Sequence, residues 1–198
     1  MLIDAVNKPD SGPLPAWTRG ATRVLAKTRI LELWGVIFSH PARKETGEFT
    51  VIHTRDWVNV VATTPDHRMV LVRQFRYGIN APSLEIPGGI IEEGENPVQA
   101  GIRELSEETG FVGTRAHLLG SINPNPAIQN NVCHLIWVEN ARLQEQTAWD
   151  EHEELEILTL PIDETYRRAR EGGITHSLVL NGLFLFEPHW AAMRAESR

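Results

Sequence analysis

Residues 89–111 read GIIEEGENPVQAGIRELSEETGF, and their pattern is the strongest structural signal in the chain. Asn96 is a good N-cap residue, and Pro97 then falls at the first helical position, where its missing N–H costs little. Gln99 can close a capping box, and Gly110 can adopt the left-handed conformation that ends many helices. The stretch therefore predicts a loop that runs into a short acidic helix.

The predicted helix carries an apolar stripe and an acidic face. At 3.6 residues per turn, the stripe that can pack on a core comprises Val98, Ile102, Leu105 and Thr109. Glu104, Glu107 and Glu108 share a different face, where like charges at this spacing weaken a bare helix. A hard divalent cation among them resolves the conflict, because carboxylate oxygens suit Mg²⁺ or Mn²⁺. Arg103 is the counter-charge within the motif, placed to hold a carboxylate in position.

These residues follow the pattern G-x5-E-x7-R-E-U-x-E-E-x-G-U, in which U is a bulky apolar residue, at every specified place. The chain therefore resembles the Nudix hydrolases. The resemblance implies an α/β sandwich with a mixed sheet, in which residues 89–111 form a loop–helix–loop. It also implies that Glu104, Glu107 and Glu108 bind metal, while Arg103 orients Glu104 or Glu107 from behind.

Composition bounds the class of protein. The chain has 198 residues, 41% of them hydrophobic and 23% charged, which suits one soluble domain with or without a small extension. A net charge of -7 disfavours nonspecific binding to nucleic acid, although a bound metal can still attract a small anionic substrate. No apolar run approaches the ~20 residues of a spanning helix, and no secretory signal is recognisable, so we expect a cytoplasmic protein without a membrane partner. Cys133, the sole cysteine, is expected to be a buried small hydrophobe.

The chain in order suggests three parts: a flexible leader at 1–20, an N-terminal antiparallel β extension at 21–55 and the hydrolase domain at 56–198. Strands are expected at 22–38, 48–54, 58–63, 69–77, 84–87, 116–122, 131–138 and 155–160. Pro161 is expected to open a helix that runs to Arg170, and a second, apolar helix at 178–186 should stop at Pro188. Strands with one intervening helix and closing helices indicate an α/β sandwich with a mixed sheet.

Two segments before the acidic helix resemble the ADP-ribose pyrophosphatase branch of the family. They are the Q-x-R segment at 74–76 and the E-x-P-x-G segment at 85–89. By that resemblance Arg76 contacts a substrate phosphate or carboxylate, Glu85 helps to bind metal, and the Gly88 carbonyl can be a further ligand. Family members commonly have alanine where this chain has Gly88, which leaves a backbone ligand possible. Pro126, sixteen residues after Gly110, is also associated with this branch.

The acidic loop at 150–154 falls where similar enzymes carry a glutamate that serves as catalytic base. Glu153 is the first candidate and Glu151 the second, while Glu107 or Glu108 could itself be the base. The loop at 127–131 lacks the serine, glycine and acidic residues of a close ADP-ribose homologue. A related nucleoside diphosphate sugar therefore remains an alternative substrate, with the side-chain amides of that loop binding its hydroxyl groups.

The leading hypothesis is a Mg²⁺-dependent hydrolase of ADP-ribose or a related nucleoside diphosphate sugar. One alternative is a (deoxy)nucleoside triphosphate or dinucleoside polyphosphate hydrolase, and another is a regulatory module that binds nucleotide sugars without cutting them. The survival of Glu104, Glu107 and Glu108 speaks against the regulatory module. In the branch that the chain resembles, an N-terminal extension exchanges across a two-fold dimer, so we expect a homodimer.

Overall fold

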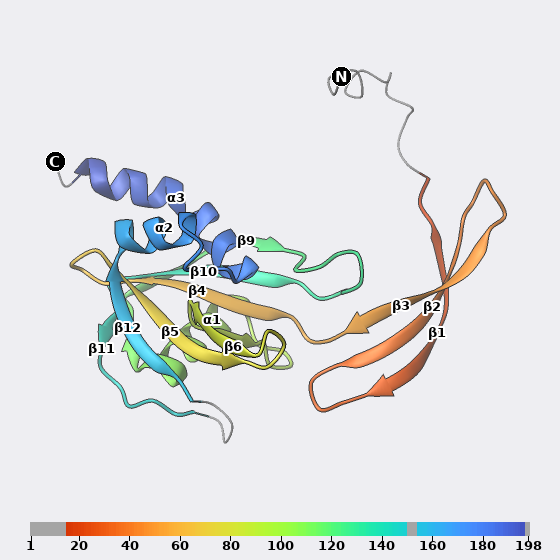
Figure 1. Cartoon of the computed structure of the whole chain (residues 1–198), viewed down its shortest axis with the longest axis horizontal. Helices are drawn as coiled ribbons and strands as arrows, with labels where there is room; N and C mark the ends of the chain where they lie inside the picture. Colours follow the sequence, from red (N-terminus) through yellow and green to blue (C-terminus); the bar gives the residue numbers. More distant parts are fainter. Residues whose placement is uncertain (1–14, 150–153, 197–198) are drawn as a thin grey trace, which may run out of the picture. The chain divides into compact units, whose positions relative to one another are not determined.

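The computed structural model describes residues 15–149 and 154–196, and the chain divides into two compact units, Met1–Thr54 and Arg55–Arg198. Figure 1 shows the elements of each unit. No helix in the described part of the chain is long and apolar enough to cross a membrane.

The N-terminal unit, Met1–Thr54, contains a three-stranded antiparallel sheet. Its strands are β1 (Thr18–Lys27), β2 (Glu32–Ser39) and β3 (Thr46–His53), in the order β1-β2-β3. Arg23 on β1 and Glu48 on β3 form an ion pair of 2.7 Å across β2, where Gly35 leaves room for the Glu48 carboxylate. The predicted antiparallel extension is therefore confirmed.

The C-terminal unit, Arg55–Arg198, is built on a mixed sheet. Its strand order is β12 (Glu156–Pro161), β5 (Arg68–Arg76), β4 (Trp57–Thr63), β10 (Cys133–Glu139) and β9 (Arg115–Ile122). Strands β4 and β10 are parallel, and the other pairs are antiparallel. Two short strands extend this sheet: β6 (Ala81–Glu85) pairs with β5, and β7 (Gly88–Ile90) pairs with β4. A separate pair comprises β8 (Phe111–Val112) and β11 (Arg142–Leu143).

Helices cover both faces of this sheet (Figure 1). On one face lies α1 (Pro97–Thr109), whose Leu105 packs with Val58 and Val60 of β4. On the other face lie α2 (Ile162–Arg170) and α3 (Ser177–Glu196), which share a core with Val61. Side chains along β4 therefore alternate between the α1 face and the α3 face, as strand geometry requires. The predicted α/β sandwich is confirmed.

Helix α1 begins and ends where the sequence predicts. The Asn96 side chain accepts a hydrogen bond of 2.9 Å from the Val98 N–H, and Gly110 ends the helix with φ of 70°. The predicted packing stripe is wrong at Ile102, which is 43% exposed. Gly101 takes the inner position instead, because a Cβ there would already lie 3.0 Å from Ile136 Cγ1 and only glycine lets the helix come so close.

Two further expectations need correction. Residues 88–90 form strand β7 where a loop is expected, because Gly88 and Gly89 pair with the β4 backbone, and a Cβ on Gly88 would lie 2.2 Å from the Val58 carbonyl oxygen. Helix α3 does not stop at Pro188 but continues to Glu196. Its last turns are held by Trp190, which is buried and donates a hydrogen bond of 2.8 Å to Asp163 of α2.

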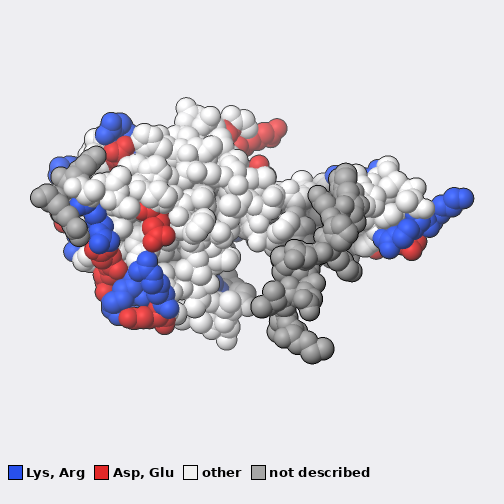
Figure 2. All heavy atoms as spheres, turned by 90° about the horizontal axis from the view of Figure 1, so that it is seen from above, with Lys and Arg blue, Asp and Glu red and all other residues white. Residues whose placement is uncertain are grey.

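The surface of the α2 and α3 layer carries both signs of charge. Figure 2, which views the molecule from above the orientation of Figure 1, shows Lys and Arg atoms beside Asp and Glu atoms. On α2, Glu164 forms ion pairs with Arg167 and Arg168. Such exposed pairs contribute little stability, typically below ~1 kcal/mol each.

Candidate active site

One arginine organises the carboxylates of α1 and of the loop before it. Arg103 donates from Nε and Nη2 to the two oxygens of Glu95 at 2.9 and 3.0 Å. Its Nη1 donates to Glu104 at 2.8 Å and to Glu107 at 2.9 Å, and its Nη2 also reaches the Ile90 carbonyl oxygen at 3.2 Å. The hydrogen bonds from Arg103 hold the pKa of Glu95 below its ordinary value. The structure thus places Arg103 against both of the glutamates that the sequence suggested, and against Glu95 as well.

Two carboxylates of α1 lie directly against strand β7. Glu108 is 4% exposed and accepts a hydrogen bond of 3.0 Å from the Gly88 N–H. Glu104 lies so near Gly89 that a Cβ there would come within 2.5 Å of its carboxyl group. Glu107 is more open, with its side chain 43% exposed. The expected acidic face is therefore split, because Glu108 turns toward the sheet and Glu107 toward solvent.

The donors at this site suit a hard divalent cation. Carboxylates and backbone carbonyls are the groups that bind Mg²⁺ or Mn²⁺. In the part of the chain that the structure describes, no three His, Cys, Asp or Glu side chains are arranged as a closed metal cluster. Glu104 and Glu107 instead share the Arg103 guanidinium, and Glu108 bonds the β7 backbone. The chemistry of the set fits a metal that takes part of its coordination from water and phosphate.

A second arginine pairs with a buried carboxylate at the end of β5. Arg76 donates from Nε and Nη2 to the two oxygens of Glu85 at 2.8 and 2.6 Å, and the Glu85 side chain has 0% exposure. Burial raises the pKa of Glu85, but the hydrogen bonds and charge of Arg76 and the nearby His176 outweigh it and lower this pKa below its ordinary value. His176 Nε2 lies 3.9 Å from Glu85. Burial lowers the pKa of His176, an effect that Glu85 opposes and Arg76 reinforces.

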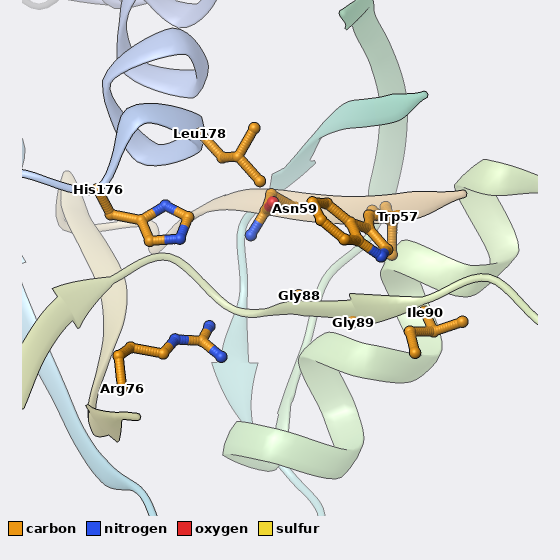
Figure 3. A pocket seen from close by; sticks show the side chains of 9 residues that line it. Trp57, Asn59, Arg76, Gly88, Gly89, Ile90, His176 and Leu178 are labelled. Atoms are coloured by element: carbon orange, nitrogen blue, oxygen red, sulfur yellow. The ribbon is translucent and has the colours of Figure 1, made fainter. Parts of the chain in front are cut away.

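A cavity of ≈ 280 Å³ joins these groups to the α3 face of the sheet. It is lined by Trp57, Val58, Asn59, Arg76, Gly88, Gly89, Ile90, His176 and Leu178. In the view of Figure 3, Arg76 and the green helix α1 lie on one side of the β7 ribbon, whereas Asn59, His176 and Leu178 lie on the other. The cavity therefore passes the glycines of β7, where no side chain obstructs it.

Sequence reasoning missed three of these lining residues as site residues. Trp57, which is half-buried, Asn59 and His176 belong to none of the sequence motifs. The one available signal was Asn59 itself, since an amide within the apolar run VNVVA needs a hydrogen-bond partner once it is buried.

One predicted site residue, Pro126, lies away from this cavity. Pro126 is exposed in a turn in which the Asn125 carbonyl accepts from the Gln129 N–H at 2.8 Å, and it does not line the cavity. Glu151 and Glu153 lie outside the described residues. Cys133 is fully buried, as expected, and burial raises the pKa of its thiol to about 12.

Comparisons with known proteins agree with this geometry. A family model described as the NUDIX domain matches residues 53–177. A methanol dehydrogenase activator of Bacillus methanolicus is 30% identical over 134 residues, which are 67% of this chain and 72% of that protein. An ADP-ribose pyrophosphatase of Bacillus subtilis (strain 168) is 29% identical over 111 residues, 56% of this chain and 60% of that protein.

A mouse protein and a solved structure extend the comparison. An ADP-sugar pyrophosphatase of Mus musculus is 29% identical over 130 residues, 63% of this chain and 60% of that protein. A crystal structure of an ADP compounds hydrolase superposes with a TM-score of 0.81 at 20% identity, covering 92% of this chain and 98% of the other. At that identity the superposition shows a shared fold.

Proposed function

This chain belongs to the Nudix family of hydrolases, and on that basis we propose that it hydrolyses the diphosphate bond of ADP-ribose or a related nucleoside diphosphate sugar with the help of Mg²⁺. The products are a nucleoside monophosphate and a sugar phosphate. The names of the bacterial and mouse pyrophosphatases support this substrate class.

The observation that carries the proposal is the position of Arg76 beside strand β7. Arg76 lines the cavity together with Gly88 and Gly89, and the same two glycines touch Glu108 and Glu104. A diphosphate that passes the glycines can therefore meet a guanidinium and the carboxylate face of α1 together. Arginine binds phosphate oxygens in a forked geometry, which fixes the diphosphate in one orientation.

The carboxylates Glu104, Glu107 and Glu108, the Gly88 carbonyl and Glu85 are the proposed holders of the metal. A bound Mg²⁺ supplies charge neutralisation of the phosphate oxygens during displacement by water. Arg103 keeps Glu104 and Glu107 in fixed orientations, so that little reorganisation is needed when the diphosphate arrives.

The base that takes the proton from water remains a proposal from the resemblance. Glu153 is our first candidate and Glu151 the second, with Glu107 or Glu108 as the alternative. The variant Glu153→Gln should lower the rate without weakening metal binding. A pH–rate profile identical to that of the parent protein would count against Glu153 as the base.

The direct test is phosphorus NMR of the purified full chain with Mg²⁺ and a mixture of ADP-ribose, GDP-mannose and a deoxynucleoside triphosphate. We expect selective loss of a nucleoside diphosphate sugar and appearance of two phosphomonoester signals. Cleavage of the triphosphate instead would replace the substrate class, and no cleavage of any of the three would refute hydrolysis of these compounds. Omission of Mg²⁺ is the matched control.

We further propose that the protein forms a homodimer through the N-terminal unit. This unit leaves large apolar side chains exposed on the single chain, including Trp17, Val24, Ile30 and Phe49. Apolar surface of this kind is typical of subunit contacts. Light scattering at micromolar concentration should give twice the mass of the chain, and a monomer would refute the proposal.

A further inference from the structure

Asn59 is a buried amide in the middle strand of the sheet. It is 6% exposed and points to the α3 face, between Trp57 and Val61 in the alternation of β4. Its Oδ1 accepts a hydrogen bond of 3.3 Å from the Cys133 thiol of β10. Because burial keeps this thiol protonated, Cys133 remains a donor and fixes which end of the amide faces it.

The other end of the amide faces the cavity. A Cβ on Gly88 would lie 2.5 Å from Asn59 Nδ2, which places this nitrogen directly over the glycine that the cavity passes. Figure 3 shows the Asn59 amide between His176 and Trp57, with its nitrogen toward Gly88. Among residues 15–149 and 154–196, no protein acceptor forms a hydrogen bond with Nδ2. A fixed donor on a 94%-buried side chain therefore presents its N–H groups to whatever enters the cavity.

The chemistry of this part of the cavity suits a sugar. At ≈ 280 Å³ the cavity is at the small end for ligand sites, so it takes one ring rather than a whole nucleotide sugar. On the α3 side of β7 it offers the Asn59 amide, the His176 imidazole and the apolar surfaces of Trp57 and Leu178. A hydroxylated ring matches such a mixture, because its hydroxyl oxygens accept hydrogen bonds and its C–H faces pack on apolar groups.

We propose that Asn59 is a specificity-determining residue, whose Nδ2 donates a hydrogen bond to a hydroxyl oxygen of the terminal sugar of the substrate, and that Cys133 is the positioning residue that holds the amide in this orientation. The inference rests on the proposed function, since it assumes a diphosphate near Arg76 with the terminal sugar beyond Gly88. It adds a residue for recognition of the sugar that lies outside the glutamate motif and outside the Q-x-R and E-x-P segments.

The first experiment compares Asn59→Ala and Asn59→Asp with the parent protein. Loss of the N–H donor should raise KM for ADP-ribose roughly 10-fold in both variants, since alanine removes the amide and aspartate keeps its size but has no N–H. The value of kcat should stay within about 3-fold, because the groups around the diphosphate are unchanged. An unchanged KM in both variants, with wild-type unfolding curves, would overturn the proposal.

Inhibition by ADP, which lacks the terminal sugar, is the matched ligand control. The inhibition constant of ADP should be the same in the parent protein and in both Asn59 variants. An equal rise for ADP and ADP-ribose would show that Asn59 reads the nucleoside or the phosphates, and would overturn the assignment to the sugar.

The role of Cys133 is tested by a pair of substitutions. Cys133→Ser keeps a hydrogen-bond donor and should retain the KM of the parent protein. Cys133→Val is similar in size but has no donor, so the amide can turn, and KM should rise by roughly 3- to 10-fold. Equal KM values for the two variants would refute the positioning role. Circular dichroism and urea unfolding establish that both variants are folded.

Binding of an uncleavable analogue separates this inference from the proposed function. Calorimetry with α,β-methylene ADP-ribose and Mg²⁺ should show binding to the parent protein and weaker binding to Asn59→Ala. If the analogue binds in this pattern but neither ADP-ribose nor GDP-mannose is cleaved, the proposed hydrolysis fails and the role of Asn59 stands. If ADP-ribose is cleaved but both proteins bind the analogue equally, the role of Asn59 fails and the hydrolysis stands. If neither occurs, both are refuted.

Discussion

Arg103 and Arg76 both hold carboxylates beside strand β7, but they do so in different ways. Arg103 distributes its hydrogen bonds over Glu95, Glu104 and Glu107, all of which reach solvent to some degree. Arg76 donates from Nε and Nη2 to the two oxygens of Glu85, and the Glu85 side chain has no exposed surface. The first arrangement tolerates the loss of one carboxylate, because the arginine keeps two others. The second is more sensitive to loss of the arginine, because a buried carboxylate then loses two charge-assisted hydrogen bonds.

The largest effect is expected from Glu107→Gln, which should reduce kcat at saturating Mg²⁺ by about 100- to 1000-fold, because it removes a carboxylate proposed to hold the metal that neutralises developing charge. Because Glu107 is partly exposed and Arg103 keeps Glu95 and Glu104, the free energy of unfolding should change by less than ~1 kcal/mol. Steady-state kinetics and urea unfolding measure the two quantities. Unchanged turnover would refute the assignment of Glu107 as a ligand.

The next largest effect should come from Arg76→Ala, which should lower both the stability of the fold and the activity. Removing the partner of buried Glu85 should lower the free energy of unfolding by about 3 kcal/mol. The double variant Arg76→Ala with Glu85→Leu should recover most of that loss, since it removes the stranded charge. Urea unfolding of the four proteins in this cycle gives the coupling. If the double variant is no more stable than Arg76→Ala, the buried pair is not the cause.

A smaller effect is expected from Arg103→Lys, which keeps the charge but loses the fork that reaches three carboxylates. Activity should fall about 10- to 100-fold, as for other residues that orient metal ligands. The apparent affinity for Mg²⁺, measured from the dependence of rate on Mg²⁺ concentration, should weaken in parallel. A variant with full activity and unchanged Mg²⁺ dependence would show that Arg103 has no part in orientation.

The smallest effect concerns pH. The folded-state pKa of Glu85 lies below its ordinary value of 4.5, so its stabilisation is fully present above that value and is lost as pH falls through the folded pKa. Over this acidic range the free energy of unfolding should fall less steeply in Glu85→Gln than in the parent protein, whatever their difference at neutral pH. Urea unfolding at several pH values below 5 gives the slopes, and parallel slopes would contradict the lowered pKa.

Local signals in the sequence predicted the local structure well. The caps of α1, the antiparallel extension and the mixed sheet follow from neighbouring residues or from strand periodicity, and the structure confirms them. Ile102 was predicted to pack on the core because the helical stripe was assigned from apolar residues alone. The structure instead places Gly101 against the core, because its small size lets the helix approach Ile136 closely. Pro188 was predicted to end α3 because proline usually interrupts a helix. The hydrogen bond from Trp190 to Asp163, which holds the end of α3, joins two separate helices and cannot be predicted from neighbouring residues.

The site was predictable only where a motif carries it. Arg103, Glu104 and Glu107 lie within two turns of one helix, so their spacing places them together. Asn59, in contrast, acquires its role from Gly88 on β7 and from Cys133 on β10, which are brought to it by strand pairing. No local sequence pattern predicts that these three residues meet. Only the amide of Asn59, in an apolar strand, indicates that a hydrogen-bond partner must exist.

The single buried thiol also allows transient exposure of the core to be measured without an added label. Cys133 lies in β10, which pairs with β4 on one side and β9 on the other, and it is completely inaccessible. An alkylating reagent can therefore modify a molecule only while the packing around Cys133, which includes Leu178 of α3, is open. Mass spectrometry of timed alkylation would count such openings without any added label. Slower alkylation in the presence of a nucleotide would then measure how strongly that nucleotide stabilises the native sheet.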